Sequence, residues 1–99
     1  MGVFTPAERE AHILNTVQLM DAVQRVEEEE NGYRFSFPNE TELIARLAEF
    51  IANERLCCPF LKFVLTVTMQ DEPLSLSLTG PAGTQEFLRE EFSRTFNQP

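Results

Sequence analysis

The segment Leu56–Phe63 (LCCPFLKF) contains the sharpest change of pattern in this sequence. Apolar residues before it recur at intervals of three and four, whereas those after it alternate with polar residues. Pro59 stands at the change. It has no amide hydrogen and pushes Cys58 toward extended backbone, so a helix has to end near Cys57. The segment therefore predicts a helix followed at once by a strand, with both cysteines of the chain at the corner.

The helix before this corner is predicted to begin just after Pro38. Asn39 is a suitable N-cap because its side chain can accept a backbone hydrogen bond, and Glu42 follows three residues later. The apolar stripe of this helix consists of Leu43, Ile44, Leu47, Phe50 and Ile51. The alanines that permit close approach to a sheet are Ala45, Ala48 and Ala52.

A β-hairpin is predicted before that helix. Asn31-Gly32 supplies the positive φ angles of a type I′ turn between strands at 23–30 and 33–37. Pairing outward from this turn places Arg34 opposite Glu29 as a favourable cross-strand pair. The aromatic residues that share one face are Tyr33, Phe35 and Phe37.

A second hairpin is predicted after the corner. Residues 61–70 and 74–79 alternate apolar side chains with mostly hydroxyl ones, on either side of a turn at 71–73. The hydroxyl face includes Thr66, Thr68, Ser75 and Ser77. This face is expected to be either solvated or the surface of a homodimer.

Helices are also predicted at both ends of the chain. Thr5 and Glu8 can form a capping box that starts a helix from Pro6 to about Leu19. Its predicted apolar stripe is Ile13, Leu14, Val17 and Met20. The last helix is predicted to open at Pro81, with a stripe of Phe87, Leu88, Phe92 and Phe96.

These elements predict one α+β domain that occupies residues 1–99. The order is α-β-β-α-β-β-α, and the economical packing is a four-stranded antiparallel sheet with the helices packed on one face. A chain of this length buries about 65% of its unfolded surface, which is enough for one modest core.

Charge and apolar content exclude several classes of partner. Sixteen acidic and eight basic residues give a net charge of −8, which repels phosphate backbones, so no nucleic-acid partner is expected. The longest apolar stretch, 56–65, is far shorter than the ~20 residues of a membrane span, so no membrane partner is expected. Because no signal peptide opens the chain, we expect a reducing, cytoplasmic location.

The adjacent thiols Cys57 and Cys58 are the strongest candidate for chemistry. Neighbouring cysteines cannot easily bridge each other, because the ring is strained. When reduced, the two thiols suit a thiophilic metal ion or a metalloid such as arsenite, although two ligands do not complete a tetrahedral site. The alternative is that they serve as small buried hydrophobes, with one left exposed because neighbours cannot both point inward.

Two further residues belong to this candidate site. Glu54 lies four residues before Cys58 on the same helix, so it can face inward as a ligand or proton acceptor, although a carboxylate at such a position more often does not. Its alternative is to reach solvent or to pair with Arg46 or Arg55. His12, the single histidine, can join as a third ligand only if the first helix packs over the corner.

The segment Glu54–Phe63 (ERLCCPFLKF), followed by Leu78–Gly83 (LTGPAG), resembles a group of small bacterial proteins. Their shared signature is E-R-x-C-C-P-F-[FL]-x-F, with L-T-G-P-x-G near the C-terminus. The resemblance implies a bacterial cytoplasmic protein and a cysteine corner that serves more than packing. It implies no particular activity, since none is established for that group.

Three functional hypotheses follow. The first is a small cytoplasmic binding protein that engages a soft metal, a metalloid or a thiol-redox partner through Cys57 and Cys58, with Glu54 as a further metal ligand. The second is a structural or protein-interaction domain in which the cysteines only pack. The third, a cysteine-dependent enzyme, is disfavoured because the negative end of a helix dipole opposes thiolate formation and no catalytic arrangement is recognisable.

Overall fold

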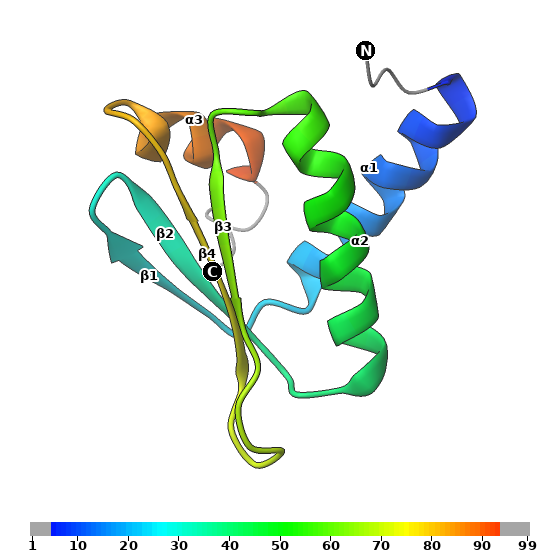
Figure 1. The fold of residues 1–99 in the computed structure, drawn as a ribbon, viewed down its shortest axis with the longest axis vertical. Helices are drawn as coiled ribbons and strands as arrows, with labels where there is room; N and C mark the ends of the chain where they lie inside the picture. Colours follow the sequence, from blue (N-terminus) through cyan, green and yellow to red (C-terminus); the bar gives the residue numbers. More distant parts are fainter. Residues whose placement is uncertain (1–4, 94–99) are drawn as a thin grey trace.

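The computed structural model describes residues 5–93 and has the predicted element order (Figure 1). The elements are α1 (Pro6–Asp21), β1 (Arg25–Glu29), β2 (Gly32–Phe37), α2 (Thr41–Cys57), β3 (Lys62–Thr66), β4 (Leu74–Thr79) and α3 (Thr84–Glu91). The strands form one antiparallel sheet in the order β1-β2-β4-β3. The helices pack on one face of this sheet, which confirms the α+β prediction.

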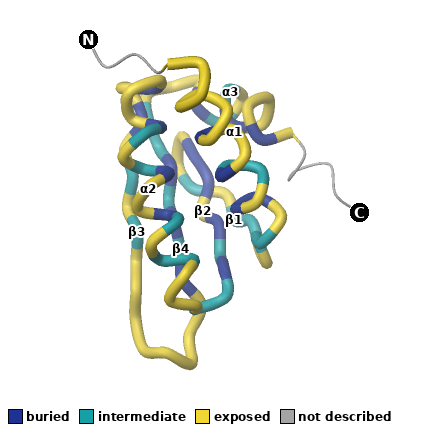
Figure 2. Tube along the Cα trace, turned by 90° about the vertical axis from the view of Figure 1, so that its right-hand side faces the viewer, coloured by how far each residue is buried: buried dark blue, intermediate teal, exposed yellow. Residues whose placement is uncertain are grey.

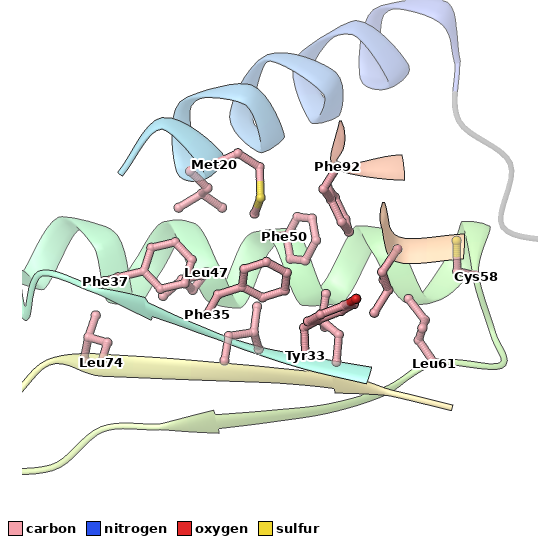
Figure 3. Packing of buried hydrophobic residues seen from close by; sticks show 14 residues of the cluster. Met20, Tyr33, Phe35, Phe37, Leu47, Phe50, Cys58, Leu61, Leu74 and Phe92 are labelled. Carbon is pink, nitrogen blue, oxygen red and sulfur yellow. The ribbon is translucent and has the colours of Figure 1, made fainter. Parts of the chain in front are cut away.

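Alternation along the two central strands creates the core (Figure 3). The residues of β2 and β4 that face the helices are at most 3% exposed: Tyr33, Phe35, Phe37, Leu74, Leu76 and Leu78. The helices contribute Leu19, Leu47, Phe50 and Leu88, all fully buried. On the opposite face Ser75 and Ser77 are half-buried and Thr66 is exposed. The predicted apolar and hydroxyl faces are therefore both present.

The register of the first hairpin differs from the prediction by two residues. The turn lies at Glu30-Asn31, and Gly32 already belongs to β2, where it pairs with Glu29. Arg34 is consequently opposite Glu27, although its guanidinium still reaches the Glu29 carboxylate at 2.8 Å. The physical reason is long-range, because Gly32 also pairs with β4, whose backbone comes too close for any side chain at this position.

The helix before the corner ends where Pro59 predicts, at Cys57, and the Cys58 amide donates to the Glu54 carbonyl at 2.8 Å. The predicted N-cap is wrong. Glu40 occupies that position without a side-chain bond, and Asn39 donates instead to the carbonyls of Met69 (3.0 Å) and Glu72 (2.8 Å). The alanines expected against the sheet are exposed: Ala45, Ala48 and Ala52.

The capping box of α1 is confirmed, with Thr5 and Glu8 bonded reciprocally at 2.9 and 3.1 Å. The predicted apolar stripe is wrong at Ile13 and Leu14, which are 55% and 58% exposed, whereas Met20 is buried as predicted. The buried side consists of His12, Asn15, Leu19 and Met20. Two polar residues face inward because α2 supplies hydrogen-bond partners for them, so α1 is rotated and its N-terminal half is largely exposed (Figure 2).

β3 and α3 are shorter than predicted, whereas β4 spans residues 74–79 as predicted. β3 ends at Thr66, which leaves Val67 and Met69 48% and 66% exposed. α3 begins at Thr84 and buries Leu88 and, just beyond its end, Phe92; the predicted stripe residue Phe96 lies outside the described residues. Within residues 5–93, no helix is both long and apolar enough to cross a bilayer.

Candidate functional site

Three helices meet at the cysteine corner and enclose a cleft of about 460 Å³. α1 and the end of α2 form two of its walls, and the last turn of α3 with Phe92 forms the third. The ionisable residues that line it are Arg9, His12, Glu54, Cys57, Glu90 and Glu91. Because it brings together residues from both ends of the chain, the cleft exists only in the folded protein.

A buried histidine–carboxylate contact forms the floor of this cleft. The His12 Nε2 lies 2.8 Å from the Glu54 Oε1, and the two residues are only 8% and 3% exposed. The His12 ring stacks on Phe50, with 5.8 Å between ring centroids. The first helix thus packs over the corner, and Glu54 faces inward, which is the less favoured of the two arrangements expected from the sequence. Arg46 pairs with Glu42 and Gln18 instead.

The two cysteines are both free and occupy different environments. Cys57 is exposed and lines the cleft, whereas Cys58 is 6% exposed and lies at the margin of the core near Leu61 (Figure 3). The Cys58 Sγ lies 3.6 Å from the Glu54 Oε2, so one carboxylate contacts both His12 and Cys58. The prediction that one thiol would remain exposed is confirmed, and the structure identifies it as Cys57.

The environment of Cys58 strongly favours the protonated thiol. Burial raises its pKa from 9.0 to about 12, and the adjacent Glu54 carboxylate contributes further to the rise. Cys58 is therefore a proton-bearing group at neutral pH and not a ready nucleophile.

Glu91 is a member of the site that the sequence pattern did not indicate. Partial desolvation raises the pKa of its carboxyl, Glu54 raises it further, and His12 lowers it. Glu91 lines the same cleft as His12 and Glu54, so α3 places a second carboxylate beside the buried pair. No local signal marks Glu91, because it is one of several acidic residues in an amphipathic helix.

The described residues do not contain a complete metal site. Across residues 5–93, no three His, Cys, Asp or Glu side chains are arranged to hold a metal ion. Cys57, Cys58, Glu54 and His12 are thus neighbours without forming a closed coordination shell. The remaining candidate ligand atoms are the two adjacent thiol sulfurs, of which that of Cys57 is exposed and that of Cys58 is buried.

No protein-family model matches this sequence, and searches of characterised proteins and of solved structures return no match.

Proposed function

We propose that this protein binds a trivalent metalloid such as arsenite through Cys57 and Cys58. The observation that carries the proposal is that the exposed thiol of Cys57 lines the cleft and that the next residue, Cys58, holds a second, buried thiol. Two thiols satisfy a trivalent metalloid, which keeps its third substituent, so no third protein ligand is required. Thiolates are also the ligands that soft elements prefer.

Proton balance favours a metalloid over a metal cation. A cation has to expel the thiol proton of Cys58, and a pKa of about 12 adds a few kcal/mol to that cost at neutral pH. Arsenous acid, As(OH)₃, reacts differently. Two As–O bonds break, two As–S bonds form, and the two thiol protons leave in two water molecules. No proton is released to solvent and no atom changes oxidation state, so the high pKa carries no such penalty.

Glu54 and His12 support this exchange from the cleft floor. The Glu54 carboxylate lies 3.6 Å from the Cys58 sulfur, where it can accept the thiol proton as the As–S bond forms and return it to the departing hydroxyl. His12 holds this carboxylate in place at 2.8 Å. Cys58 itself lies just beyond the end of α2, so its side chain can reorient without disrupting the helix.

The resemblance of residues 54–63 to small bacterial proteins supports a bacterial, cytoplasmic setting for this role. There, reduction keeps both thiols free. The net charge of −8 likewise supports a neutral ligand or a protein partner over nucleic acid. A thiol-redox partner uses the same exposed residue, Cys57, and differs from the metalloid in requiring only one thiol.

A structural role for the cysteines is the second candidate, because Cys58 belongs to the hydrophobic cluster of the core. On this alternative, Cys57 is an exposed surface thiol without a ligand. A cysteine-dependent enzyme is disfavoured by the raised pKa of Cys58.

The native protein should show one fast and one slow thiol. Cys57 should react with a small disulfide reagent at the rate of an exposed thiol. Cys58 should react about 100-fold or more slowly, because its reaction requires local opening that costs about 3 kcal/mol. Stopped-flow thiol titration of the wild type and of Cys57→Ser measures both rates. Two equally fast thiols would contradict the burial of Cys58.

Phenylarsine oxide should protect Cys57 from alkylation in the wild type at a stoichiometry of one arsenical per chain. In Cys58→Ser this protection should weaken by about 100-fold or more, because chelation by two thiols gives way to a single bond. Protection is measured by mass spectrometry after iodoacetamide treatment. In a parallel experiment Zn²⁺ replaces phenylarsine oxide, so that a metal cation is compared with the arsenical. Equal protection in Cys58→Ser would exclude two-thiol binding and support the single-thiol partner. No protection in the wild type would favour the structural role.

A further inference from the structure

The two edges of the sheet are protected unequally. β1 (RVEEE) forms one edge and carries four charged residues, with contacts such as Arg25–Glu27 at 3.4 Å. Charges of this kind deter pairing with another strand. β3 (KFVLT) forms the other edge with one charge, Lys62, and with Val64 44% exposed at its centre. Among the described strands β3 pairs only with β4, so its outer backbone groups are available to a further strand.

One flank of α2 adds apolar surface beside this edge. Ile44 and Ile51 are half-buried and Ala48 is exposed, and helical spacing places the three on one side. The opposite flank is the one that α1 occupies, through the bond from Asn15 to the Arg46 carbonyl. Figure 2 shows α2 beside β3, and the Phe50 ring of α2 contacts the Phe63 ring of β3, with 6.5 Å between the ring centroids.

The sequence of β3 is complementary to a second copy of itself. In an antiparallel pair with Val64 on the two-fold axis, Lys62 of one copy lies opposite Thr66 of the other. Lys62 then adjoins the loop that follows Thr66 in the second copy. That loop carries Asp71 and Glu72, and the Glu72 carboxylate is held by the Thr68 hydroxyl at 2.9 Å. Each Lys62 ammonium therefore adjoins the acidic loop of the other copy, and the two-fold axis repeats this contact at both ends of the paired strands.

We propose that two copies of this chain pair through the outer edges of β3 to form a homodimer. The two four-stranded sheets become one continuous sheet, and the free flanks of α2 pack together over it. The cleft lies on the α1 side of α2 and remains open to solvent in this arrangement. The dimer is thus independent of ligand binding at the cysteines.

Val64→Glu should raise the dissociation constant of the dimer about tenfold or more, because two carboxylates then oppose each other at the two-fold axis. Sedimentation over a concentration series measures this constant, and circular dichroism checks that the exposed substitution leaves the fold intact. Leu14→Glu on α1 is the matched control: its side chain is 58% exposed, and the dissociation constant should not change.

Two further variants identify the contact. Lys62→Glu should weaken the dimer at low salt, and adding Glu72→Lys should restore it by reversing the charge pair. Ser36→Glu lies on the outer face of β2, two strands from β3, and should have no effect. A wild type that stays monomeric at millimolar concentration would overturn the proposal. Loss of the dimer in Ser36→Glu as well as in Val64→Glu would place the contact on the hydroxyl face and overturn it too.

Discussion

His12→Ala should lower the free energy of unfolding by about 3–5 kcal/mol, because it leaves the Glu54 carboxylate buried without its imidazole partner. Glu54 is 3% exposed and its Oε1 lies 2.8 Å from the His12 Nε2, so the contact is buried in the folded protein. The substitution also removes a ring stacked on Phe50. Urea unfolding followed by circular dichroism measures the loss.

Two comparisons isolate the contribution of the buried carboxylate. Ile13→Ala, at the neighbouring exposed position of α1, should change stability by less than about 0.5 kcal/mol. The double variant His12→Ala/Glu54→Leu should recover much of the loss, because an apolar side chain in place of Glu54 needs no partner. If His12→Ala behaves like Ile13→Ala, the histidine–carboxylate contact is not a buried one and the proposed floor of the cleft is incorrect.

His12→Ala should also change the reactivity of the Cys58 thiol. Loss of His12 frees one side of Glu54 and opens the cleft toward Cys58. We therefore expect Cys58 to be alkylated faster in His12→Ala than in the wild type, at a denaturant-free condition where both are folded. The expected increase has a physical reason: in the wild type, alkylation of Cys58 requires a local opening, and loss of His12 makes this opening easier.

Gly32→Ala should destabilise the protein by about 3 kcal/mol or more, because there is no space for a Cβ at this position. A Cβ on Gly32 would lie 2.0 Å from the Leu78 carbonyl oxygen and 2.8 Å from the Thr79 Cα. Both are backbone atoms of β4, so relief requires separation of the two central strands. Urea unfolding gives the magnitude, and hydrogen exchange at the β2–β4 amides gives its location.

Gly83→Ala is the matched glycine control. Gly83 has a φ of 96° and nothing within 4 Å of an added Cβ, so its replacement meets only backbone strain. That strain should cost about 1–2 kcal/mol. Equal losses in the two variants would show that β2 and β4 do not approach as closely as the structure places them.

Several features of this fold follow from the sequence because short-range physics determines them. Thr5 and Glu8 form the predicted capping box, since both partners lie within one helical turn. Pro59 ends α2 at Cys57 through its own missing amide hydrogen. The alternation along β2 and β4 separates apolar from hydroxyl side chains whatever the neighbouring strands are. These local signals were sufficient for the α-β-β-α-β-β-α order.

Only the tertiary structure decided the rotation of α1, the register of the first hairpin and the identity of the buried thiol. His12 faces inward because Glu54, 42 residues away, supplies its partner, and hydropathy alone places Ile13 and Leu14 there instead. Gly32 joins β2 because β4 passes too close for a side chain. These deciding contacts join residues far apart in sequence, so a local sequence pattern does not predict them.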